Sequence, residues 1–313
     1  MDPEEQRRAQ FQANIRAEFK RNAFLLINEM VEMASHNQDT SQLVDEILHS
    51  IFFLGEINRP KISPREIFDA DVDMVDDLQK KYPEPFTRYS SRLPRRSPFS
   101  CVLDMVVHLK GQEHEDDIRE TLQKLVQELK PRRRRRKPML CSSSICISAG
   151  KRTNSVRHYG VSMSTTDSNS KIMIAASCLS FWEAHVAHAV SSCYYPVENS
   201  TADFDVTIQL SDVICKAFDL ISRGEKSPCL FCRNMFGLTS DTQDLQTPKW
   251  PYGNCAEAES LSNLLREEEV RIQRNGNWTE ENQERVKNGV RNELGRQLNH
   301  LHFEWDNQFY KEQ

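Results

Sequence analysis

Three cysteines in the last third of the chain constrain its fold more than any other feature. Cys229 and Cys232 follow Pro228 at a spacing that suits the first turn of a helix, and Cys255 begins a second predicted helix. Thiolates so arranged can share one metal ion, and three sulfurs leave one of the four positions of zinc open to water. The sequence therefore predicts two helix N-termini that meet over one Zn²⁺ ion bound by Cys229, Cys232 and Cys255.

The chain has nine cysteines in 313 residues, and the cellular compartment decides how they are interpreted. Residues 1–8 do not resemble a signal peptide, and no apolar run reaches the roughly 18 residues of a membrane span. We therefore expect an intracellular protein without a membrane partner. Cysteines stay reduced there, so closely spaced ones indicate metal ligands or core positions rather than disulfides.

The first 130 residues show the period of amphipathic helices. Apolar side chains recur at spacings of three, four and seven among many charges, with proline or polar breaks between segments. Helices are predicted over residues 6–33, 41–54, 64–81, 100–110 and 115–130. We expect residues 1–130 to form an all-helical domain that buries its own apolar faces, with a surface for a protein partner as the alternative.

A basic run, Arg132 to Lys137, lies between Pro131 and Pro138 and is the sharpest change of composition in the chain. Five arginines and a lysine must stay solvated, so residues 131–138 are predicted to be a linker between domains. Nuclear localisation and contact with nucleic-acid phosphates are the alternatives, and the expected location is cytoplasmic, nuclear or both. The net charge of −5 gives the whole chain no attraction to nucleic acid, so such a partner would need this patch.

Residues 139–313 mix strands with helices. Strands are predicted at 141–148, 155–164, 171–176 and 205–210, the second and third as a hairpin, and helices at 180–195, 212–223 and 279–310. This pattern predicts an α/β domain whose mixed sheet is covered by helices. The ten glycines form neither a P-loop nor a dinucleotide fingerprint, which disfavours kinases, NTPases and nicotinamide-dependent enzymes.

Glu257 provides a carboxylate next to the predicted metal site. It follows Cys255 by two residues, so on a helix it points in another direction and can lie beside water at the open position without binding the metal. Zinc lowers the pKa of water, and a neighbouring carboxylate can carry a water proton to a leaving amine. Hydrolytic deamination needs this combination of groups.

The motifs Pro228-Cys229-x-x-Cys232 and Cys255-Ala256-Glu257 resemble the signature motifs of the zinc-dependent cytidine deaminase superfamily. The resemblance covers about residues 139–270 and implies a deaminase-like fold, zinc on the three cysteines and Glu257 as the proton shuttle. It also implies a nucleobase substrate, carried by a nucleoside, a nucleotide or a nucleic acid. The motifs stand in reversed order relative to the family. A circularly permuted fold would preserve the geometry, because a metal site depends on position in space.

Two other interpretations of the cysteines stay open. A fourth protein ligand would close the site and make the zinc structural, in an interaction protein without catalysis; the candidates are Cys193, Cys215, His185 and His188. Alternatively, Cys229 and Cys232 form a redox pair, since Cys-x-x-Cys at a helix start also suits thiol exchange. Cys178 and Cys215 lie in apolar segments, which favours a place in the core.

Overall fold

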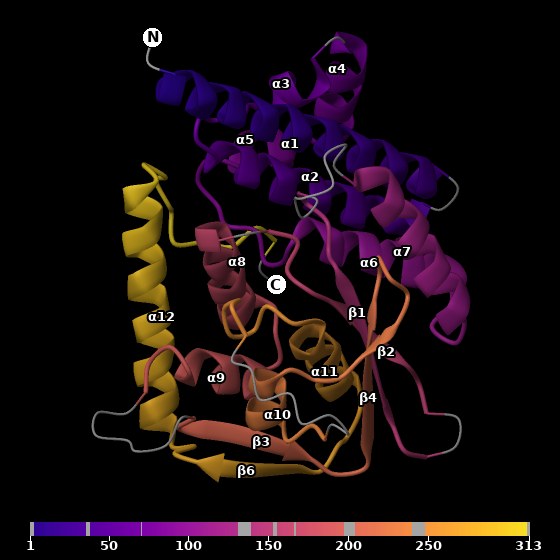
Figure 1. The fold of residues 1–313 in the computed structure, drawn as a ribbon, viewed down its shortest axis with the longest axis vertical. Coiled ribbons are helices and arrows are strands. Elements are labelled where there is room, and N and C mark those ends of the chain that lie inside the picture. The colour runs from indigo at the N-terminus through magenta and orange to yellow at the C-terminus, as the bar shows by residue number, and fades with distance from the viewer. Residues whose placement is uncertain are drawn as a thin grey trace.

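The computed structural model describes residues 3–35, 38–69, 71–130, 139–152, 155–165, 167–196, 204–239 and 248–311. The predicted linker 131–138 lies outside the described residues. Helices from the N-terminal part of the chain pack on a C-terminal part that holds two small sheets and further helices (Figure 1). Within the described ranges, no helix is long and apolar enough to cross a membrane.

The N-terminal part is helical, as predicted. Its helices are α1 (Pro3–Ser35), α2 (Ser41–Glu56), α3 (Pro64–Phe68), α4 (Val72–Lys81), α5 (Pro83–Arg88), α6 (Pro98–Lys110) and α7 (Glu115–Leu129), with a short 3₁₀ turn, η1 (Gln38–Thr40), before α2. The single helix expected over 64–81 is divided into α3 and α4, because Asp69 has a φ of 40° and leaves the right-handed helical region. Ser63 and Glu66 form a capping box that begins α3, and the Asp71 side chain caps α4.

The C-terminal part alternates strands and helices. Its elements are β1 (Ser144–Gly150), β2 (His158–Val161), α8 (Asp167–Ser180), α9 (Ala184–Ser192), β3 (Val206–Leu210), β4 (Val213–Asp219), β5 (Glu225–Lys226), α10 (Leu230–Phe236), α11 (Ala256–Glu267), β6 (Ile272–Gly276) and α12 (Glu280–His300).

Two segments have the opposite structure to the predicted one. Residues 171–176, expected to be a strand, lie inside α8, where Ile172, Met173 and Ile174 are all buried. A short apolar run of this kind has no period that separates a buried helix from a strand. Residues 212–223, expected to be a helix, contain strand β4, because β1 and β5 pair with its two edges and this pairing overrides the local pattern.

Every strand pair in the described elements is antiparallel, so the expectation of a mixed sheet is wrong. One sheet has the order β2-β1-β4-β5, and β3 pairs with β6 in the other. Cys146 of β1 lies opposite Gly160 of β2 and Ala217 of β4. The partner of β2 is therefore β1, and the predicted hairpin of β2 with the segment 171–176 does not form. Strand β6 is a strand that the sequence did not predict.

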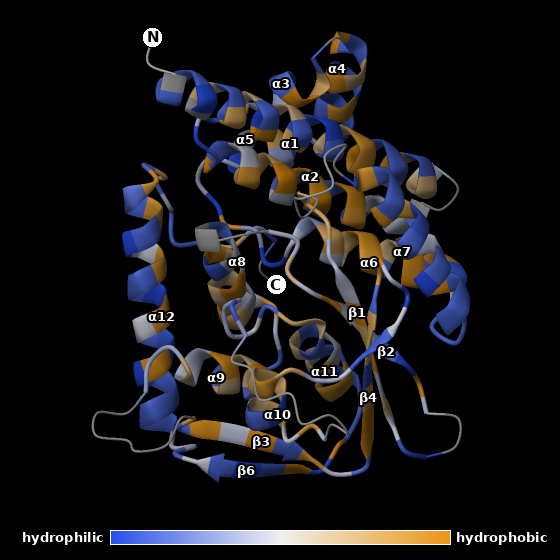
Figure 2. Cartoon of the chain, in the orientation of Figure 1, coloured by the Kyte–Doolittle hydropathy of each residue, from blue (hydrophilic) through white to orange (hydrophobic). Residues whose placement is uncertain are grey.

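The largest hydrophobic cluster joins the N-terminal and C-terminal parts. Helices α2 and α6, which are largely apolar in Figure 2, bury side chains in the same cluster as β1, α8 and α12. A second cluster joins α9, β3, α10 and α11. The predicted boundary at 131–138 thus separates two parts with a common core, and the division into domains stays a prediction.

The last described residues return to the N-terminal helices. Helix α12 ends at His300, so the helix predicted to reach Tyr310 is shorter than expected. Phe309 forms a β-bridge with Leu93, and the ring of Tyr310 stacks on His49 of α2 with the ring centroids 3.8 Å apart. Both aromatic side chains are buried, so the C-terminal aromatic residues anchor this segment on the N-terminal part.

Candidate metal centre

The three predicted cysteines come together at the start of two helices. Cys229 is the N-cap residue of α10 and Cys255 is the N-cap residue of α11, both with extended backbone, while Cys232 lies in the first turn of α10. Their Sγ atoms all lie within 4.8 Å of one another, and the Sγ atoms of Cys229 and Cys255 are 3.5 Å apart. This cluster could hold a metal ion.

Hydrogen bonds within the cluster concentrate negative charge on Cys229. The thiols of Cys232 and Cys255 donate to Cys229, as do the backbone N–H groups of Phe231 and Cys232, and together they lower the pKa of Cys229 to about 3. The bond to Cys229 raises the pKa of Cys232 and of Cys255 well above the ordinary value. A cluster with one thiolate and two thiols needs a cation before all three sulfurs can ionise.

Glu257 lies beside the cluster without belonging to the three-sulfur group. Its side chain is in the first turn of α11 and is only 5% exposed. Burial raises its pKa to about 7 and the nearby Cys229 adds to this effect, whereas its own backbone N–H and the adjacent Cys232 side chain lower the pKa. A buried carboxylate therefore contacts one candidate metal ligand directly.

The candidates for a fourth ligand lie elsewhere. Among the described residues, none of them joins the group formed by Cys229, Cys232 and Cys255. His185 and His188 both pack against the ring of Trp278, the Cys193 thiol donates to the carbonyl oxygen of Ala189, and Cys215 Sγ lies 3.2 Å from Cys146 Sγ. Within the described part of the chain, the cluster thus offers three protein ligands.

The loop before Cys255 is held in a single arrangement by contacts that the sequence did not reveal. Gly253 has a φ of 77°, and a Cβ atom there would lie 2.7 Å from Val190 Cγ1. The Met163 N–H donates to the carbonyl oxygen of Asn254 at 3.0 Å, and the Tyr194 hydroxyl donates to that of Tyr252 at 2.8 Å. These contacts determine where Cys255 begins its helix.

Helix α11 lies directly on the first sheet. A Cβ atom at Gly160 would lie 2.1 Å from the backbone nitrogen of Ser260, so only glycine allows β2 to approach α11 this closely. The Ser260 hydroxyl donates to the carbonyl oxygen of His158 at 2.9 Å, and the Ser148 hydroxyl donates to that of Ser260 at 2.9 Å. The sheet therefore positions the helix that carries Glu257.

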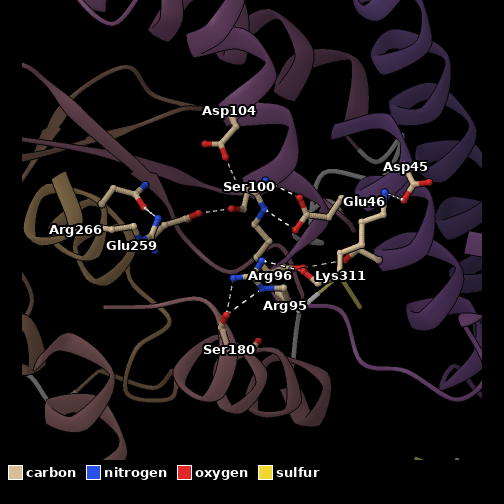
Figure 3. Close-up of polar contacts among 12 residues, drawn as sticks. Asp45, Glu46, Arg95, Arg96, Ser100, Asp104, Ser180, Glu259, Arg266 and Lys311 are labelled. Atoms are coloured by element: carbon tan, nitrogen blue, oxygen red, sulfur yellow. Dashed lines mark hydrogen bonds and ion pairs between the residues drawn. The ribbon is translucent and has the colours of Figure 1, made fainter. Parts of the chain in front are cut away.

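A buried polar network joins the N-terminal helices to α11 (Figure 3). Arg96 donates two hydrogen bonds to the Glu46 carboxylate, at 3.1 and 2.8 Å, and also contacts Asp104. In the first turn of α6, the Ser100 hydroxyl donates to Glu259 of α11, whose second oxygen accepts the N–H of Val161 at 3.0 Å. Glu259 thus connects α6 and β2 to the helix of the candidate site.

Glu259→Gln is expected to remove a pH dependence of folding stability. Burial raises the pKa of Glu259 from 4.5 to about 7, with Asp104 adding to the effect, while the bonds from Ser100 and Val161 and the charge of Arg96 oppose it. A raised pKa means that the folded state favours the protonated acid. This stabilisation is complete below pH 4.5 and is lost as the pH rises through 7, by about 3 kcal/mol.

Urea unfolding at pH 5 and pH 8 measures this effect. Glutamine keeps one acceptor and one donor but cannot ionise, so the wild type should lose stability relative to the variant at the higher pH. Glu257 titrates in both proteins, and its contribution cancels in the comparison. Equal changes in the free energy of unfolding for both proteins would contradict the prediction.

One cavity of the described structure lies away from the cysteines. It has a volume of about 410 Å³ and opens near the C-terminal half of α11, with His158, Asn263, Arg266 and Glu267 in its lining. None of the three cysteines lines it. The chemistry of the cysteine cluster, rather than this cavity, therefore identifies the candidate site.

Comparison with protein-family models, curated proteins and solved structures finds no match to this chain. Any function has to follow from the chemistry of the site itself.

Proposed function

We propose that the chain is a zinc-dependent hydrolytic deaminase that acts on the amino group of a nucleobase. The observation that carries the proposal is the meeting of three thiols from two helix N-termini, with the buried Glu257 carboxylate against one of them. The substrate class is a cytosine-like or adenine-like base in a nucleoside, a nucleotide or a nucleic acid.

Zinc fits the three sulfur donors. Zn–S bonds of about 2.3 Å in a tetrahedral site separate the sulfurs by about 3.8 Å. The observed sulfur atoms lie within 4.8 Å of one another, with one pair at 3.5 Å, so small side-chain movements would complete the geometry. Cysteine sulfur is also the donor that favours zinc over magnesium or calcium.

The number of protein ligands favours a catalytic site over a structural one. Structural zinc sites are closed by four protein ligands, whereas catalytic sites have three and an open position. The described residues provide three. The reversed order of the two motifs does not oppose the proposal, because α10 and α11 bring Cys229 and Cys255 together whatever their order in the chain.

Glu257 has the position required to move protons in this reaction. Zinc held by the cysteines would lower the pKa of water and so prepare it for attack. Glu257 takes a proton from the water and delivers it to the departing nitrogen, while the water oxygen bonds to the amino-bearing carbon and the carbon–nitrogen bond breaks. The second proton of the water moves to the ring nitrogen next to that carbon, so the products are a carbonyl group on the base and ammonia.

Metal analysis and an assay of ammonia release test the proposal together. We expect one zinc per chain, removal by a chelator, and ammonia release from cytidine, adenosine or single-stranded oligonucleotides that stops without zinc and returns with it. In the Co²⁺-substituted protein, azide should change the visible spectrum by occupying the open position. Zinc that resists chelation, with a spectrum insensitive to azide, would instead indicate a structural site in an interaction protein. A chain without zinc would exclude both functions.

A further inference from the structure

Trp250 makes a contact with a candidate metal ligand that the proposed reaction does not use. Its indole Nε1–H donates to the Sγ atom of Cys255 at 3.0 Å. The residue is 39% exposed, so a large aromatic side chain stays at the surface while its single polar group turns inward to the sulfur.

The surrounding loop makes this contact reproducible. The Asn254 N–H donates to the carbonyl oxygen of Pro251 at 3.2 Å, which closes a turn between Trp250 and Cys255. The ring of the intervening Tyr252 packs on Phe231 of α10, with the ring centroids 4.2 Å apart. The turn is therefore closed by a hydrogen bond and packed against α10, and the indole N–H is directed at the Cys255 sulfur.

The strength of the N–H···S bond depends on the charge of the sulfur. A neutral thiol is a weak acceptor, whereas a hydrogen bond to an ionised group is about twice as strong as a neutral one. The contact is therefore strongest when Cys255 is a thiolate bound to a metal. Groups that hydrogen-bond to metal ligands orient them and adjust how much electron density they give to the metal.

We infer that Trp250 is a positioning residue for Cys255. The indole N–H holds the Cys255 sulfur toward Cys229 and Cys232 and withdraws electron density from the thiolate, which keeps a bound metal more electrophilic. The inference depends on the proposed function only in requiring that the three cysteines bind a metal.

Cobalt binding to Trp250→Phe tests this role. Phenylalanine keeps an aromatic ring and removes only the N–H donor. We expect Co²⁺ affinity to fall roughly 10-fold, within the range known for groups that support metal ligands. The thiolate-to-cobalt charge-transfer band should move to longer wavelength because the sulfur becomes more electron-rich.

Trp305→Phe is the matched control. Its indole N–H also donates at 3.0 Å, but to the backbone carbonyl oxygen of Gln308. This variant should bind Co²⁺ with the wild-type affinity and spectrum. An unchanged affinity and band in Trp250→Phe would overturn the inference, as would an equal change in both variants. A wild type that binds no Co²⁺ would instead show that the three cysteines do not form a metal site.

A second variant keeps the test valid if Trp250→Phe does not fold. Trp250→His keeps a ring N–H at the same position, whereas Trp250→Leu has no donor. The charge-transfer band of Trp250→His should therefore lie between the wild-type band and that of Trp250→Leu. A Trp250→His band that coincides with that of Trp250→Leu would count against the inference.

Discussion

Glu257→Gln is expected to abolish deamination and to leave the zinc content unchanged. Glutamine has the size of glutamate but cannot accept a proton from water, and general acid–base catalysis of this kind contributes roughly 10²- to 10⁴-fold in rate. Zinc should remain because Glu257 is outside the three-sulfur group. The measurements are kcat for ammonia release and zinc per chain.

Glu259→Gln is the matched control for this experiment. Glu259 lies on the same helix and is also buried, but its carboxylate contacts Ser100 and the N–H of Val161 rather than a cysteine. This variant should keep its activity at pH 7. If both glutamine variants lost activity equally, the effect would come from disturbance of α11 and not from a missing proton acceptor. If Glu257→Gln kept its activity, Glu257 would not be the proton carrier.

Cys255→Ser is expected to release the metal. Serine removes one of three sulfur ligands and offers in its place a hydroxyl that ionises far less readily. The loss of affinity should exceed the roughly 10- to 100-fold cost of changing a group outside the ligand set. Added zinc stabilises a protein that binds it only when folded, so zinc should raise the Tm of the wild type and not that of the variant.

Cys215→Ser provides the comparison, since it makes the same chemical change at a partly buried cysteine outside the group. It should keep one zinc per chain and a Tm that responds to zinc. Loss of zinc from Cys215→Ser would mean that the ligand set is different from Cys229, Cys232 and Cys255. Retention of zinc by Cys255→Ser would lead to the same conclusion.

The N-terminal helices have a role in the candidate site that does not require a partner. Ser100 of α6 holds Glu259, and Arg96 before it is paired with Glu46 of α2 in the buried interior. Unpairing such a buried charge typically costs 3–5 kcal/mol. The proposed recruitment of a protein partner by these helices stays a prediction, and the helices also support the helix that carries Glu257.

The sequence alone was sufficient for elements whose pattern is long and local. The N-terminal helices follow from repeated apolar spacing, and the Cys-x-x-Cys and Cys-Ala-Glu spacings identified the cluster residues, because neighbours on one helical turn are close in any fold. Shorter segments were ambiguous, since the apolar run 171–176 suits a helix or a strand equally well and strand pairing overrides the local pattern in 212–223.

Only the tertiary structure decided which of these alternatives forms and which distant residues meet. Strand β4 exists because β1 and β5 take up its backbone hydrogen bonds, and no property of residues 213–219 specifies those partners. In the same way, the contact of Cys229 with Cys255 and the Ser100–Glu259 bond join segments whose approach depends on packing of the whole core. Local hydrogen bonding determines the elements, whereas burial of apolar surface across many elements determines their arrangement.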